Sequence, residues 1–297
     1  MWLSLQLFAA LCWALVAVFD SILVKHYEKR PYVLMWFQSC FSVPVLLAVL
    51  LFSGHSTPWM IPLVIAGMIA FLGDITFFAV LDRVDASVVQ IAWAMFAVFL
   101  SAISIAFFGE TWSSVQIVGV ILLLSGILFL SLHGKGLIGK GGFLLLFLLA
   151  ILYVPFYAVQ KAAMRDGTTV LLAFVVPLLS REILCFAVPL LVPHWRGAVT
   201  SVVRRVRWPF LMICGSVVTL FFTATYLNTW VYNIGPLSIG SVVSNVQPFF
   251  VLFAAWMLWK IAPSFAPREL FTRQAVSVKI ISFLIVFSGL ALLALPQ

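Results

Sequence analysis

Four charged residues fall inside long apolar stretches of the sequence. Asp20 lies late in the first stretch, Asp74 lies in the middle of the third, and Arg181 and Glu182 lie in the middle of the seventh. In the hydrocarbon of a membrane, a charged side chain costs roughly 2.5–3.5 kcal/mol on insertion scales. Each of these residues is therefore a candidate for substrate binding or for moving a proton.

Asp74 is the most prominent of the four, because its neighbours Phe71, Phe77 and Phe78 are aromatic and the nearby sequence holds no cation. We expect Asp74 to bind substrate, a proton or both, and we take Asp20 and Glu182 as further candidates for coupling.

Each of the other charged residues also has an alternative interpretation, in which its role is structural. Asp20 could instead reach the lipid headgroups. Arg181 and Glu182 could join their helix to a neighbour, since adjacent residues point about 100° apart on a helix and do not simply pair with each other.

Polar and aromatic side chains recur along four further stretches at spacings compatible with one helical face. The candidates for substrate contact, besides Asp74, are Gln90, Trp93, Tyr157, Gln160, Tyr226, Trp230 and Asn245. An aromatic pocket beside a carboxylate suits an amphipathic solute that carries an amine, held partly by cation–π contact. The alternative for each aromatic residue is packing in the core or anchoring at the membrane interface.

The composition indicates the class of protein that positions these residues. Of the 297 residues, 64% are hydrophobic and only 9% are charged, whereas a soluble domain carries about 25% charge. This excludes soluble enzymes, nucleic-acid-binding modules and disordered chains, and the net charge of +8 then reflects membrane loops rather than a nucleic-acid partner.

Apolar stretches long enough to cross a bilayer as helices recur along the whole chain. They cover residues 2–24, 32–53, 59–81, 87–108, 114–132, 142–162, 169–192, 208–233, 239–259 and 278–296. We therefore predict an all-α integral membrane protein with ten transmembrane helices.

A Gly- and Lys-rich linker at residues 134–142 divides the chain into halves of five stretches, residues 1–133 and 143–297. The halves resemble each other: Trp13 with Asp20 matches Tyr153 with Gln160 at a constant shift. An odd number of crossings in each half inverts the second relative to the first. Inverted repeats of this kind build transporters with a site near the membrane midplane.

Specific residues resemble a known family. Phe108-Gly109-Glu110-Thr111, followed by Gly119 and Gly126 in an apolar run, looks like the end of an EamA-type repeat, and Gly235-Pro236 with Pro248 looks like its counterpart in the second half. The chain thus resembles the drug/metabolite transporter superfamily in its ten-helix form with two EamA-like repeats. It departs from that pattern at Ile261, which stands where a second Gly-Glu would be.

Charge placement predicts an orientation. Of the 17 Lys and Arg residues, all but Lys161, Arg165 and Arg181 follow an odd-numbered stretch. Positive residues concentrate on the cytoplasmic side, so we expect the odd loops in the cytoplasm and both termini outside. The resemblance implies the opposite, with both termini in the cytoplasm.

We expect a secondary transporter that exports a small amphipathic metabolite by alternating access, without a cofactor, metal or enzymatic activity. Its partners would be the solute and the lipid bilayer, not nucleic acid, and it would be a monomer or weak homodimer in the cell membrane. The alternatives are a lipid or lipid-carrier translocase, an integral membrane transferase and a scaffolding subunit.

We interpret the four cysteines as small buried hydrophobic residues. We interpret the prolines within the stretches either as residues that the helix packing tolerates or as hinges.

Overall fold

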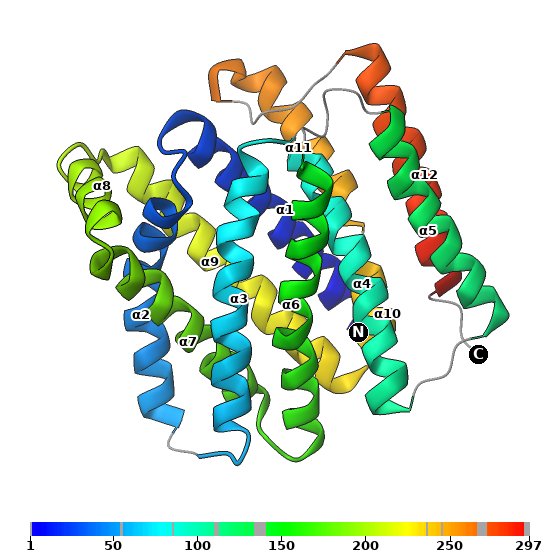
Figure 1. Ribbon diagram of the computed structural model, residues 1–297, viewed down its shortest axis with the longest axis horizontal. Coiled ribbons are helices and arrows are strands. Elements are labelled where there is room, and N and C mark those ends of the chain that lie inside the picture. The colour runs from blue at the N-terminus through cyan, green and yellow to red at the C-terminus, as the bar shows by residue number, and fades with distance from the viewer. Residues whose placement is uncertain are drawn as a thin grey trace.

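The computed structural model describes residues 2–53, 56–84, 86–109, 113–133, 141–235, 237–244, 246–265 and 272–293. Within these ranges every regular element is a helix, which confirms the predicted all-α class (Figure 1). The helices are α1 (Trp2–His26), α2 (Pro31–Ser53), α3 (Met60–Leu81), α4 (Ala86–Phe108), α5 (Ser114–His133), α6 (Gly142–Arg165), α7 (Val170–Leu191), α8 (Pro193–Val203), α9 (Trp208–Ile234), α10 (Leu237–Ser244), α11 (Gln247–Ile261) and α12 (Arg273–Leu293), with a 3₁₀ turn at Pro263–Phe265.

Six helices in the described residues are long and apolar enough to cross a membrane: α1, α2, α3, α6, α7 and α9. Two shorter apolar segments accompany them, Ala92–Phe108 of α4 and Gln247–Ile261, which is α11. Each long helix is apolar around its whole circumference, as expected for helices that face lipid on one side and protein on the other.

Two elements differ from the sequence prediction. The stretch predicted at residues 239–259 is interrupted at Val246, which separates α10 from α11. Pro248 has no backbone N–H to bond the carbonyl of Ser244, so the helical hydrogen bonding is broken there. In addition, the connection between α7 and α9 contains the short helix α8, which begins at Pro193, a residue suited to the first turn.

The positions of two lysines also correct the prediction. Lys279, counted above among the positive residues that follow an odd-numbered stretch, lies inside α12 and is fully buried. Lys161, one of the three exceptions to that charge pattern, lies inside α6, where its ammonium donates to the backbone oxygens of Tyr232 at 2.6 Å and Gly235 at 3.2 Å.

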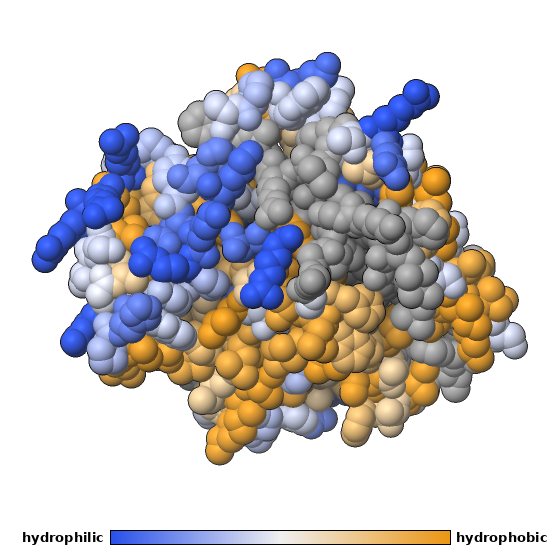
Figure 2. Space-filling view, turned by 45° about the horizontal axis from the view of Figure 1, so that its top comes forward, coloured by the Kyte–Doolittle hydropathy of each residue, from blue (hydrophilic) through white to orange (hydrophobic). Residues whose placement is uncertain are grey.

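The two ends of the bundle differ in character. The connections that follow α1 and α3 lie at the upper end in Figure 1, and those that follow α2 and α6 lie at the lower end. Figure 2 turns the upper end toward the viewer and shows hydrophilic residues gathered there above an apolar surface.

Helices from the two halves of the chain pack against each other rather than forming separate units. α3 contacts α6 and α7, α1 contacts α9, α2 contacts α7, and α5 contacts α12. Some helices approach each other closely at glycine. A Cβ atom on Gly126 of α5 would lie 2.8 Å from Val286 Cγ2 of α12, and Ser282 Oγ donates to the Gly126 carbonyl at 2.7 Å.

Candidate functional site

A cavity of about 580 Å³ lies among α1, α2, α3, α4, α6, α7, α9 and α11. All four intramembrane charges predicted from the sequence line it: Asp20, Asp74, Arg181 and Glu182. The remaining walls are mainly aromatic and aliphatic, and include Trp13, Phe77, Phe78, Trp93, Tyr153 and Phe221. The fold therefore brings together charges that lie far apart in the sequence.

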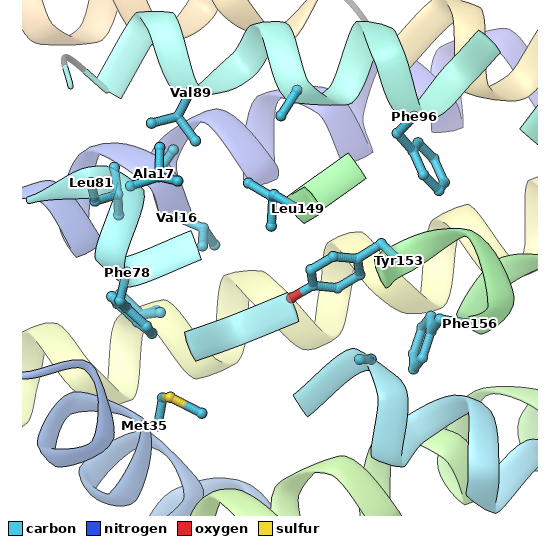
Figure 3. Packing of buried hydrophobic residues seen from close by; sticks show 14 of the residues in the cluster. Val16, Ala17, Met35, Phe78, Leu81, Val89, Phe96, Leu149, Tyr153 and Phe156 are labelled. Atoms are coloured by element: carbon cyan, nitrogen blue, oxygen red, sulfur yellow. The ribbon is translucent and has the colours of Figure 1, made fainter. Parts of the chain in front are cut away.

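Asp74 is neutralised by a cation from another helix. Arg181 Nε of α7 pairs with Asp74 Oδ2, and the Tyr153 hydroxyl of α6 donates to Asp74 Oδ1. Figure 3 shows the Tyr153 ring extending from its helix into the centre of the bundle. The local sequence around Asp74 contains no cation, but the fold supplies one that lies 107 positions further along.

Arg181 makes two further contacts. Its guanidinium carbon lies 4.4 Å from the centroid of the Phe221 ring, in the geometry of a cation–π contact. Its Nη2 atom lies 3.6 Å from Glu182 Oε1. The expectation that these adjacent residues do not pair is therefore wrong, because the long arginine side chain reaches its neighbour.

Asp20 lines the same cavity from α1. Its Oδ1 accepts a hydrogen bond of 2.7 Å from Gln38 Nε2 of α2, and Asp20 is 3% exposed. Among the described residues, no Lys, Arg or His nitrogen lies within 4.0 Å of its carboxylate. The described cavity wall thus holds three carboxyl groups and one guanidinium, an excess of two acids.

A second cavity of about 410 Å³ adjoins the first. Three residues, Trp13, Trp93 and Gln247, line both cavities and form the wall between them. The rest of the second cavity is uncharged, with Phe96, Tyr157, Asn228, Tyr232, Ser241 and Ser244. Gln6 of α1 donates from Nε2 to Asn228 Oδ1 at 3.0 Å and to Ser244 Oγ, which ties α1 to α9 and α10 beside this cavity.

The remaining predicted contact residues lie in different places. Trp93 lines both cavities and Tyr157 lines the second. Gln160 is fully buried behind them, where its Oε1 accepts from Thr229 Oγ1 at 3.4 Å. Tyr226 packs against Phe174 and Trp230, and Trp230 is 42% exposed on the outside. The side chain of Gln90 and all of Asn245 lie outside the described part of the chain.

The cavity residues that were not among the predicted contacts include Trp13, Gln38, Tyr153 and Gln247. The internal repeat carried a signal for two of them. Trp13 and Tyr153 occupy matching positions in the two halves, and both face the central cavity in the structure. For Gln38 and Gln247 the sequence pattern offers no comparable signal.

Gly73 makes room for the Tyr153 ring, because a Cβ atom at this position would lie 2.7 Å from Tyr153 Cε2. We expect Gly73→Ala to displace the ring and to lower the unfolding free energy by about 1–3 kcal/mol, the usual cost of overpacking. Denaturation of the purified protein in detergent measures this loss. The double variant Gly73→Ala/Tyr153→Leu should recover part of it, since the obstacle is a side chain; no recovery would show that the ring is not the cause.

The sequence profile of the EamA-like transporter family matches residues 1–132. This part of the chain, somewhat less than half of its length, is thus similar to the EamA-like transporter family. A solved crystal structure is similar over 98% of this chain and 98% of its own, with 16% identity and a TM-score of 0.59. At that identity the likeness shows a shared fold. A comparison with curated proteins finds no match.

The EamA-like match and the apolar helices identify a multi-pass membrane protein of the transporter type. This confirms the resemblance to the drug/metabolite transporter superfamily. The EamA-like half contributes Trp13, Asp20, Asp74 and Trp93 to the central cavity, and the second half contributes Tyr153, Arg181, Glu182 and Gln247.

Proposed function

We propose that the protein is a secondary active transporter that moves a small amphipathic metabolite across the cell membrane by alternating access, with export as its direction. In this proposal ten helices cross the membrane as two inverted halves, residues 1–133 and 143–297, joined by the linker at 134–142. The odd-numbered loops face the cytoplasm, and the site lies where the halves meet.

The observation that carries this proposal is the excess of two acids in the buried central cavity. A buried carboxylate without a cationic partner is strongly unfavourable. The Asp74 carboxylate already has Arg181 as its partner. Glu182 also lies 3.6 Å from Arg181, but one guanidinium balances only one of the three negative charges. The two acids in excess therefore need either protons or a cationic solute, and an exchange between the two would couple solute movement to a proton gradient.

The pairing of Asp74 with Arg181 also determines where a cationic solute would bind. Asp74 is occupied by Arg181 and Tyr153, so it serves to position the guanidinium rather than to hold an amine. The amine would instead lie between Asp20 and Glu182. The rings of Trp13, Phe77 and Trp93 on the same wall would cover the apolar part of the solute and contribute cation–π attraction.

Alternating access also requires parts of the bundle to separate. The contacts of Gln6 with Asn228 and Ser244 tie three helices together beside the second cavity. In the proposed cycle these hydrogen bonds break when the cavity opens on that side. The interruption at Val246, next to Gln247 in the shared wall, allows α10 to move without α11.

Transport by purified protein in liposomes tests the proposal. We expect an imposed pH gradient to drive uptake of at least one amphipathic amine from a panel. Asp20→Asn and Glu182→Gln should each lower the gradient-driven rate about tenfold or more, since each removes one proton-binding carboxyl group. The control Asp82→Asn changes an exposed acid beside Lys29 at the bundle end and should transport normally. Transport that ignores the pH gradient would contradict proton coupling, and no transport of any solute would contradict the function.

A further inference from the structure

A basic pocket of about 850 Å³ opens at the end of the bundle where α1 meets α2 and α8 leads into α9. It lies outside the central cavity and shares no residue with it. Its wall consists of His26, Tyr27, Glu28, Arg30, Ser201, Val202, Arg205, Val206, Arg207 and Phe210.

The pocket keeps a surplus of positive charge. Glu28 accepts two hydrogen bonds from Arg30, one from Nε to Oε1 at 2.7 Å and one from Nη2 to Oε2 at 2.6 Å. Burial opposes ionisation of this carboxyl group, but the bonds and charge of Arg30 outweigh it and lower the pKa of Glu28. Among the described residues, no carboxylate lies within 4.0 Å of Arg205 or Arg207. Two guanidinium groups are thus available to an anion.

An apolar groove of about 1630 Å³ lies along α9, the helix that also contributes Phe210 to the pocket. Phe210 lines the pocket, and its neighbours Trp208 and Leu211 line the groove. The opposite wall comes from Phe19 of α1 and from Phe41 and Val45 of α2. Several of the lining side chains are exposed on the outer surface, among them Trp208 at 75% and Met212 at 63%.

The polar atoms in the groove are already satisfied. The hydroxyl groups of Ser216, Thr219 and Thr223 each donate to a carbonyl four residues earlier in α9, at 2.9 Å. The surface that they present outward is therefore methyl and methylene. The groove extends along α9 from Trp208 to Thr223, about 22 Å at 1.5 Å per residue, which exceeds half of the roughly 30 Å hydrocarbon core.

We infer that this pocket and groove together bind one anionic glycerophospholipid, with its phosphate on Arg205 and Arg207 and an acyl chain along α9. Basic pockets at helix ends bind anionic headgroups, and each arginine near the surface contributes to the attraction. The aromatic residues at this level support the placement, since Tyr27 packs on Phe210 and Tyr32 stacks on Trp195 at 4.6 Å, as in interfacial belts. A water-soluble phosphate would use the pocket but not the groove.

The proposed lipid also touches the wall of the transport site. Val218 lines both the apolar groove and the central cavity, so an acyl chain in the groove would contact a residue that also forms the wall of the transport site. The inference does not depend on which solute is transported, because lipid binding is measured on the purified protein at rest.

Native mass spectrometry of the full chain in a non-ionic detergent tests the inference. We expect phosphatidylglycerol to bind at least tenfold more tightly than phosphatidylcholine of the same chain length. The double variant Arg205→Gln/Arg207→Gln should weaken phosphatidylglycerol binding about 30-fold, the effect of two interfacial arginines. The matched control is Arg196→Gln on α8, which changes an exposed arginine outside the pocket and should bind normally. Equal binding of both lipids, or an unaffected double variant, would overturn the inference.

A second variant tests the groove separately. Gly215 has open space around it, with Phe41 Cε1 as the nearest atom at 4.0 Å, so Gly215→Leu would fill the groove without disturbing the packing. We expect it to weaken phosphatidylglycerol binding at least fivefold while binding of soluble glycerol phosphate stays unchanged. If glycerol phosphate binds wild-type protein as tightly as the lipid does, the site is a phosphate site and the lipid assignment is wrong.

Discussion

Replacing Arg181 with glutamine should lower the unfolding free energy by about 3–5 kcal/mol and abolish transport, because removing one partner of a buried ion pair leaves the other charge uncompensated. Arg181 is the one cation among the described cavity residues, and it faces Asp74 directly and Glu182 at 3.6 Å. Its loss would leave three buried carboxyl groups without a counter-charge. Chemical denaturation in detergent and uptake by liposomes measure the two effects.

The double variant Asp74→Asn/Arg181→Gln distinguishes an ion-pair role from direct solute binding by Arg181. It removes the pair as a whole and leaves Asp20 and Glu182, the same excess of two acids as in the wild-type cavity. We therefore expect it to recover at least half of the stability lost in Arg181→Gln, together with measurable transport. If stability returns but transport does not, Arg181 contacts the solute itself. Additive losses in the double variant would show that the two residues do not act as a pair.

Gly67→Ala should have the second largest effect on stability, about 3 kcal/mol or more, at the upper end of overpacking costs. A Cβ atom at Gly67 of α3 would collide with the carbonyl oxygen of Pro177 and with Ser180 Oγ of α7. Ser180 Oγ also donates to the Val64 carbonyl at 3.0 Å across the same contact. Because the Pro177 obstacle is backbone, the two helices must move apart, and they carry Asp74 and Arg181.

Two comparisons make the Gly67 prediction specific. Gly215→Ala makes the same chemical change in an open environment, where alanine favours the helix, so it should be neutral or slightly stabilising. Adding Ser180→Gly to Gly67→Ala should not restore stability, since the Pro177 carbonyl remains. A Gly67→Ala protein with wild-type denaturation and transport would show that α3 and α7 do not approach as closely as described.

The helix positions could largely be predicted from the sequence, because a bilayer-spanning helix needs a long apolar run and polar groups end it. α2, α3 and α7 begin and end within one residue of the predicted stretches. The search for apolar runs does not predict α8, because its eleven residues mix apolar and basic side chains. The interruption before α11 had a visible cause in Pro248, but a proline alone does not tell whether a helix bends or breaks.

The central charges could be found from the sequence, but their partners could not. Charge inside an apolar run is visible without a structure, and all four such residues line one cavity. The pairing of Asp74 with Arg181 depends on how α3 and α7 are rotated, and helices that are apolar all round carry no signal for that rotation. The same ambiguity explains why Trp230, placed beside Tyr226 on one helical face, is half exposed on the outside while Trp93 lines both cavities.

The pairing of α5 with α12 has a consequence for how the chain assembles. The two helices lie side by side at one edge of the bundle and contact each other (Figure 1). α5 ends at His133 and α12 begins at Arg273, so during synthesis α5 is complete before residues 134–272 and then α12 have been made. Its contact surface, with Gly126 at the centre, stays open to lipid or to other nascent helices in that interval. The EamA-like segment therefore cannot complete the packing of α5 by itself, because α12 belongs to the other half of the chain.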